Sequence, residues 1–169
     1  MDNRYLLIIV FILICLVNLF FIASNSDEIG SASVIAGEFI FELPKNFNIL
    51  ESTGDHVSLQ NPDTNLNVNV YTNQNRIYDF NKTVSKINNE TNVKILSNGS
   101  INVNNITVNA IYYTHYPENI SANYSAFVFS KDNHVFQINM KNFNYKNDLN
   151  YTVEVLDVIV SSIRVNPKT

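Results

Sequence analysis

The residue types that usually catalyse reactions or bind metals do not form a recognisable site in this sequence. The three histidines, His56, His115 and His134, lie far apart, without the short spacing of a metal-binding helix. Cys15 is the one cysteine, so neither an intramolecular disulfide nor a multi-cysteine metal site can form. The sequence contains no G-x-S-x-G nucleophile motif and no glycine-rich phosphate loop. We therefore expect no catalytic residues, no metal and no cofactor, and predict that the protein is not an enzyme.

A second pattern with chemical meaning is N-x-[ST], the acceptor sequence for N-linked glycans, which occurs seven times. All seven asparagines fall in predicted loops, turns or element ends, where a glycan can project into water. Asparagine also favours turns for conformational reasons, so the pattern alone does not establish modification. Asn119 and Asn123 are the best candidates because they lie in a predicted loop between long strands. The candidate glycosylation sites are Asn81, Asn89, Asn98, Asn105, Asn119, Asn123 and Asn150.

Four tyrosines form the best candidate for a binding surface. Tyr112, Tyr113 and Tyr116 lie close together on one predicted strand, and Tyr124 follows the next loop. Aromatic side chains can provide a platform for a sugar or a peptide. Aromatic residues also favour strands and must fill the core of a chain without tryptophan. We expect the exposed members of this tyrosine group to contact a ligand or partner.

Composition limits the class of protein to which the chain can belong. With 46% apolar residues among 169, the chain is too apolar to be disordered and long enough for one domain. Eleven basic residues stand against fifteen acidic ones, a net charge of -4 that gives no basic surface for nucleic acid. We expect no nucleic-acid partner.

Residues 5–23 predict a membrane anchor. This run contains one strongly polar residue, Asn18, and as a helix it would span about 28 Å, close to the hydrocarbon thickness of a bilayer. Arg4 precedes it and acidic residues follow it, which places residues 1–4 in the cytoplasm. The alternative is a cleaved secretory signal ending near Ser26. Either interpretation exports the remainder, so we predict a single-pass protein of the cell membrane with an extracytoplasmic domain.

The exported part is predicted to contain a linker, residues 24–36, and one domain, residues 37–169. Alternating apolar residues and turn signals predict the strands, of which residues 66–70 alternate most regularly. Asp132 and Asn133 suit a tight hairpin turn. Asp79 can cap a helix, and apolar residues at three- and four-residue steps predict a second helix from 147 or 148 to Arg164. The predicted strands are residues 39–43, 56–60, 66–71, 93–97, 106–116, 124–131 and 134–140.

The strand over residues 124–131 has apolar side chains on both of its faces. Other elements must therefore pack on both faces of the sheet at this strand. Helices are predicted before and after the group of strands. We therefore predict an α+β domain: an antiparallel sheet of about six or seven strands with helices on both faces, preceded by one transmembrane helix.

The order of these elements resembles the PsbP-like fold, named for an extrinsic subunit of photosystem II. The opening segment, residues 37–44 followed by Phe47, is similar to the aromatic strand of that family that runs into a proline. The segment 158–163 is similar to its last helix. The resemblance covers nearly all of 37–165 and implies fold alone, since the family shares no catalytic residues.

The sequence is compatible with three functions. The leading hypothesis is a non-enzymatic surface protein that recognises an envelope protein or another cell-envelope component. The second is a small-molecule or carbohydrate-binding domain that uses an aromatic sheet edge. The third is an exported hydrolase whose site is assembled from residues distant in sequence. A pocket with converging polar groups would favour the second or third, and a flat apolar patch the first.

Overall fold

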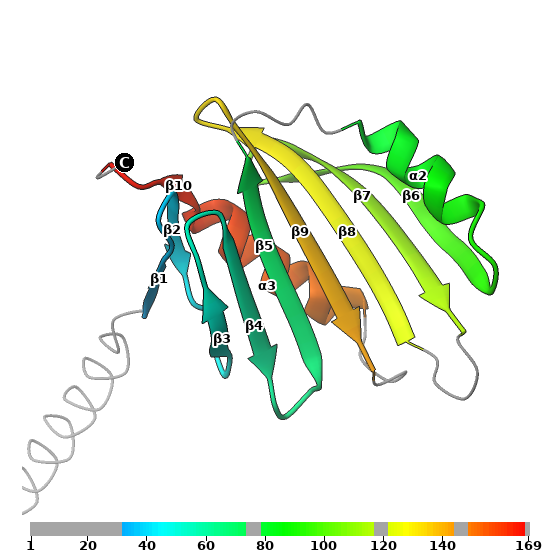
Figure 1. The fold of residues 1–169 in the computed structure, drawn as a ribbon, viewed down its shortest axis with the longest axis horizontal. Helices are drawn as coiled ribbons and strands as arrows, with labels where there is room; N and C mark the ends of the chain where they lie inside the picture. Colours follow the sequence, from blue (N-terminus) through cyan, green and yellow to red (C-terminus); the bar gives the residue numbers. More distant parts are fainter. Residues whose placement is uncertain (1–31, 74–78, 117–121, 144–148, 168–169) are drawn as a thin grey trace, which may run out of the picture. The chain divides into compact units, whose positions relative to one another are not determined.

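The computed structural model describes residues 32–73, 79–116, 122–143 and 149–167 (Figure 1). The chain divides into two units, Met1–Ala32 and Ser33–Thr169, and all of the described helices and strands belong to the second unit. The predicted cytoplasmic stub, 1–4, and the predicted anchor, 5–23, lie outside the described residues and stay predictions. Within the described ranges, no helix has the length and apolar character needed to cross a bilayer.

A seven-stranded antiparallel sheet forms the centre of the domain. Its strand order is β3-β4-β5-β9-β8-β7-β6, and a smaller sheet has the order β1-β2-β10. The large sheet consists of β3 (Asn48–Ser52), β4 (His56–Asn61), β5 (Leu66–Asn73), β6 (Val93–Val103), β7 (Ile106–His115), β8 (Ala122–Lys131) and β9 (His134–Asn142). The small sheet consists of β1 (Ser33–Ile35), β2 (Phe39–Glu42) and β10 (Arg164–Val165).

The alternation seen in the sequence decides which side of each strand is buried. In β4, the burial alternates residue by residue, and Val57 and Leu59 are fully buried. Val57 pairs with Val70 of β5, which pairs with Ile138 of β9, so apolar residues run in rows across the sheet. The β8–β9 turn at Asp132 and Asn133 is confirmed, with φ of 51° and 61°.

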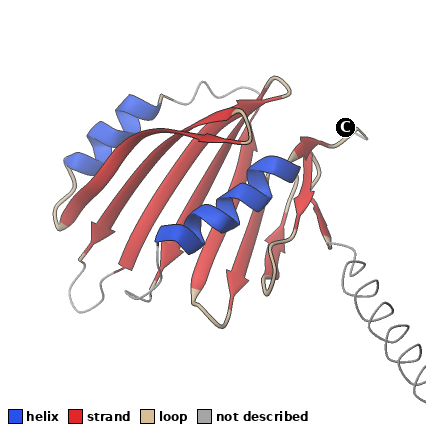
Figure 2. Cartoon of the chain, turned by 180° about the vertical axis from the view of Figure 1, so that it is seen from behind, coloured by secondary structure: helices blue, strands red, loops and turns tan. Residues whose placement is uncertain are grey.

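Two helices lie on opposite faces of the sheet. Figure 2 shows α3 (Leu149–Ser162) across one face, and Figure 1, from the other side, shows α2 (Phe80–Asn88) beside β6. On the face of α3, side chains such as Leu156 pack with the main core, which includes Phe127 and Phe136. On the other face, Ile87 of α2 packs on Ile111 and Ala126 in a much smaller cluster. Helices on both faces are therefore confirmed, with α2 contacting one end of its face.

The start of α2 follows the prediction, and α3 differs from it in two ways. The Asp79 side chain accepts a hydrogen bond from the Lys82 backbone at 3.1 Å, as a helix cap does. The predicted end of α3 at Arg164 is wrong, because the helix ends at Ser162 and Arg164 pairs with β2. Its predicted buried face is also shifted, since Leu149 is 53% exposed while Ile159 is fully buried.

The predicted linker, residues 24–36, extends too far into the domain. Val34 and Ala36 are buried, and β1 pairs with β2 along its length. The next residue, Gly37, touches the backbone of Gly54, and a Cβ added to Gly37 would lie 2.8 Å from the Gly54 Cα. The folded domain thus begins at Ser33, because the three-residue strand β1 pairs with one edge of β2.

Candidate functional site

An apolar pocket of about 300 Å³ lies at one end of the α3 face. Leu66 of β5 and Met140 of β9 are buried in its wall, whereas Leu96 of β6 and Leu149 of α3 are 56% and 53% exposed at its border. Tyr112 of β7 also lines it. The pocket therefore brings together strands and a helix that are up to 86 residues apart in sequence, from Leu66 to Thr152.

The polar groups of this pocket are hydroxyls and side-chain amides. Burial raises the pKa of the Tyr112 hydroxyl above its ordinary value, so the phenol stays protonated. The Tyr112 ring packs edge-on against Phe127, with centroids 5.5 Å apart. The side-chain oxygen of Asn123 accepts a hydrogen bond from Thr114 at 3.2 Å. Such a lining suits an uncharged, apolar part of a ligand.

A second hollow, a groove of about 350 Å³, lies on the opposite face between α2 and the sheet. Thr83 and Ile87 of α2 line one side. The sheet contributes aromatic and amide side chains, namely Tyr113, Tyr124, Asn69, Gln137 and Asn139, together with Lys141. The two faces of one sheet thus carry hollows of different chemistry.

The predicted tyrosine group is divided between these two faces. Tyr113 and Tyr124 pair across β7 and β8, with ring centroids 5.3 Å apart and planes 12° apart. Tyr112 points to the α3 face because neighbouring residues of a strand alternate. Tyr124 borders both hollows, and Tyr116 is 47% exposed beyond the end of β7. The structure brings Tyr113 and Tyr124 together; a binding role for the four stays a prediction.

The candidate glycosylation sites differ in exposure. Asn81, Asn89, Asn98, Asn105 and Asn150 are exposed, whereas Asn123 is half-buried and Asn119 lies outside the described residues. Several lie inside elements instead of in loops, since Asn98 lies in the middle of β6 and Asn123 lies in β8. The hydrogen bond from Thr114 also makes Asn123 a poorer candidate than the sequence indicated. Modification of any site stays a prediction.

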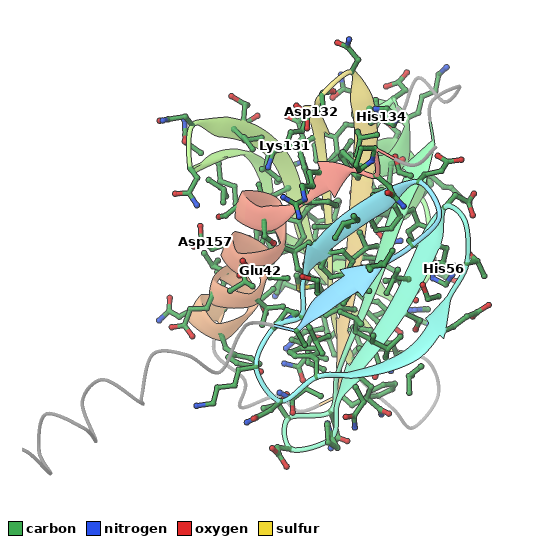
Figure 3. All side chains as sticks on the ribbon, turned by 90° about the vertical axis from the view of Figure 1, so that its left-hand side faces the viewer. Glu42, His56, Lys131, Asp132, His134 and Asp157 are labelled. Carbon is green, nitrogen blue, oxygen red and sulfur yellow. The ribbon has the colours of Figure 1, made fainter. Side chains whose placement is uncertain are left out.

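The histidines do not converge. Figure 3 shows His134 beside Asp132 at the β8–β9 turn and His56 at a separate place on the sheet. His56 stacks on Tyr71, with ring centroids 4.5 Å apart, and a His56 ring nitrogen lies 3.2 Å from the side-chain oxygen of Asn69. In the part of the chain that the structure describes, no three histidine, cysteine or acidic residues are grouped for a metal ion.

The residues that form the apolar pocket were not identified from the sequence. Leu66 and Met140 lie on strands where they read as ordinary core residues, and Leu149 reads as part of the buried helix face. Leu96 is the clearest missed signal, because it is the one apolar residue of its half of β6 that is more than half exposed. Nothing in local spacing relates it to Leu149.

The chain resembles known proteins in its fold and not in its sequence. No protein-family model and no curated protein sequence matches the chain. A solved structure from Bacteroides thetaiotaomicron has a TM-score of 0.53 at 10% identity over 77% of this chain, which spans 46% of that longer protein. LpqN, involved in cell envelope biogenesis of Mycobacterium tuberculosis, has a TM-score of 0.52 at 9% identity, covering 83% of this chain and 88% of LpqN.

The cyanobacterial PsbP protein of Synechocystis sp. PCC 6803 matches with a TM-score of 0.49 at 13% identity, covering 82% of this chain and 99% of that one. The chain has a PsbP-like fold. The resemblance predicted from the sequence is confirmed through the likeness to LpqN, with its TM-score of 0.52, and at such identities the likeness concerns the fold alone.

Proposed function

We propose that this domain is a non-enzymatic binding module that takes an apolar ligand in the pocket on the α3 face. The pocket itself supports this proposal. It has a volume of about 300 Å³ and is bordered by two leucines that are more than half exposed. That volume is at the lower end of ligand sites, which are mostly apolar with a few polar groups. Tyr112, Thr152 and Ser125 are such polar groups here.

The border leucines explain why a ligand would bind. Full burial of a leucine side chain is worth about 1.5–3 kcal/mol. Leu96 and Leu149 are each about half exposed, so covering both recovers roughly the value of one whole leucine. The domain keeps these side chains in water at a cost that an apolar ligand removes.

A component of the cell envelope is the occupant that fits best. The predicted anchor, residues 5–23, would hold the domain at the outer surface of a membrane, where aliphatic chains are abundant. LpqN, which shares the fold, is involved in cell envelope biogenesis. We therefore favour a ligand that contributes a single aliphatic chain, in preference to a hydrolysable substrate.

The proposal can be tested by titrating the full chain, held in lipid nanodiscs, with dansyl-labelled undecanoate against a blank of empty nanodiscs, and by displacing the probe with dodecanoate. We expect saturable binding and a rise in dansyl fluorescence. The double variant Leu96→Gln/Leu149→Gln should weaken binding by about tenfold, the value of about 1.4 kcal/mol of lost apolar contact.

Leu50→Gln provides the matched control. Leu50 is 59% exposed on β3 and does not line the pocket, so its replacement removes a similar leucine without touching the site. Equal binding by the control and the double variant, or no saturable binding by the natural chain, would contradict the proposal.

A further inference from the structure

The groove on the α2 face has a composition unlike that of a protein core. Amide side chains of Asn69, Gln137 and Asn139 line it together with the rings of Tyr113 and Tyr124, and all five are partly exposed. These residues come from four adjacent strands, β5, β9, β8 and β7. The groove therefore offers a small ligand many hydrogen-bonding groups beside aromatic surface.

The strand register places the side chains of Asn69 and Asn139 side by side. Asn69 pairs with Asn139 across β5 and β9, and Asn139 pairs with Ala126 across β9 and β8. Neighbouring strands lie about 4.8 Å apart, so the two amides are spaced by that distance, and the short side chain of Ala126 leaves room beside them. The groove lies over this row of side chains, and α2 forms one of its walls.

Internal hydrogen bonds hold the amides in place without using all of their atoms. The Gln137 side-chain nitrogen donates to the Asn139 side-chain oxygen at 2.9 Å. The Asn69 side-chain oxygen lies 3.2 Å from a His56 ring nitrogen. Each amide has two donor hydrogens and an oxygen with two lone pairs, so both donating and accepting groups remain for a ligand. A ligand rich in hydroxyl groups, which also donate and accept, matches this set.

The aromatic end of the groove adds an apolar wall and one charge. The rings of Tyr113 and Tyr124 are stacked, with centroids 5.3 Å apart, and the Lys141 ammonium lies 5.3 Å from the centroid of Tyr124. Lys141 is the one charged residue among those lining the groove. A sugar has hydroxyl groups at its rim and apolar C–H surface on its ring faces, and a carboxylate on it would meet Lys141.

We infer that the groove between α2 and the sheet binds an oligosaccharide, and that Lys141 makes it favour sugars that carry a carboxylate. This site lies on the opposite face from the pocket of the proposed function and takes a different class of ligand, so either can fail without the other.

The test uses the full chain in detergent and three acidic probes: oligogalacturonate, sialyllactose and a hyaluronate oligosaccharide. Each probe is compared with its carboxyl-reduced form by isothermal titration calorimetry. We expect at least one acidic probe to bind, and to bind more tightly than its reduced form. The preference should fall as ionic strength rises, because salt screens the contribution of an exposed charge.

Two variants locate the binding. Asn69→Ala/Asn139→Ala should weaken the best probe by about tenfold, through the loss of two hydrogen-bonding amides. Lys141→Gln should abolish the preference for the acidic form, so that each acidic probe and its reduced form bind equally tightly. Gln60→Ala is the matched control, since Gln60 is a partly exposed amide on β4 outside the groove and its loss should change nothing.

Folding and the apolar pocket serve as internal checks on the same proteins. The variants should still melt cooperatively and keep the dansyl-undecanoate affinity of the natural chain. Absence of binding to all three acidic probes, or undiminished binding by the folded double variant, would overturn the inference. Equally tight competition by an acidic peptide such as poly-glutamate would assign the groove to a protein partner and would also overturn it.

Discussion

The two faces of the seven-stranded sheet are built from the same strands, yet they are closed to different degrees. On the α3 face, Val68 of β5 and Ile138 of β9 belong to a continuous core that includes the helix and both aromatic residues of β2. On the α2 face, the residues next to them, Asn69 and Gln137, are amides that remain partly exposed. Because side chains alternate along each strand, the α3 face is mostly buried and the α2 face is partly exposed. We call them the sealed face and the open face.

Each face leaves a hollow of a different kind. The sealed face leaves an unfilled space at the beginning of α3, bordered by Leu96 and Leu149. The open face leaves a groove because α2 packs on Ile111 and Ala126 and stops short of β5. The first space is apolar and the second is polar, as the alternation dictates.

Val160→Asp should have the largest effect, because it breaks the sealed face. Val160 is fully buried in α3, and an unpaired carboxylate there should cost about 4 kcal/mol or more of the free energy of unfolding. Domains of this size have about 5–15 kcal/mol in total, so we expect loss of cooperative melting by circular dichroism. Val153→Asp, on the exposed side of the same helix, should melt nearly normally. A cooperative transition for Val160→Asp near the natural temperature would show that α3 packs by another face.

Ile159→Ala compared with Ile87→Ala measures the difference between the faces directly. Ile159 is fully buried under α3, whereas Ile87 is 7% exposed in the small cluster under α2. We expect a loss of about 3–5 kcal/mol for Ile159→Ala and about 2 kcal/mol for Ile87→Ala in urea unfolding. Equal losses would mean that α2 contributes as much as α3 to the core.

Gly37→Ala tests how the small sheet joins the large one. A methyl group at Gly37 would meet the Gly54 backbone at 2.8 Å, and backbone atoms cannot yield as a flexible side chain does. We expect a loss of about 1–3 kcal/mol in the free energy of unfolding. Gly54→Ala is the control, since nothing lies within 4 Å of a Cβ built there. If both substitutions cost the same, the contact does not constrain the fold.

Asn133→Ala should have the smallest effect, because it alters a turn that both faces share. Asn133 has φ of 61°, a left-handed conformation that costs an alanine about 1–2 kcal/mol. Asn133→Gly removes the same side chain but tolerates that conformation, so it should retain the natural melting temperature within a few degrees. A destabilised glycine variant would show that the side chain, and not the backbone, matters.

Much of the fold could be predicted from the sequence because each long strand alternates and each helix has a periodic apolar face. The missed strands lack that signal: β3 is exposed at all five positions, and β1 has three residues. The second half of β6 was missed for the same reason, since residues 98–100 are exposed on both sides of the strand.

The candidate site was harder to predict because it depends on contacts between distant elements. Alternation within one strand places Tyr112 and Tyr113 on opposite faces, but their closeness in sequence led us to treat them as one surface. The relation of Leu96 to Leu149 is purely tertiary, set by how α3 crosses the sheet. The amides of the open face, in contrast, are visible in the alternation of residues 66–70; what the sequence lacks is the position of α2 beside them.

Hydrogen–deuterium exchange of the full chain, with and without saturating dodecanoate, tests whether the α3-face pocket is a ligand site. We expect slower amide exchange in peptides that cover Leu96 and the first turns of α3 from Leu149, with no change in α2. Unchanged exchange around both leucines, or protection confined to α2, would contradict it.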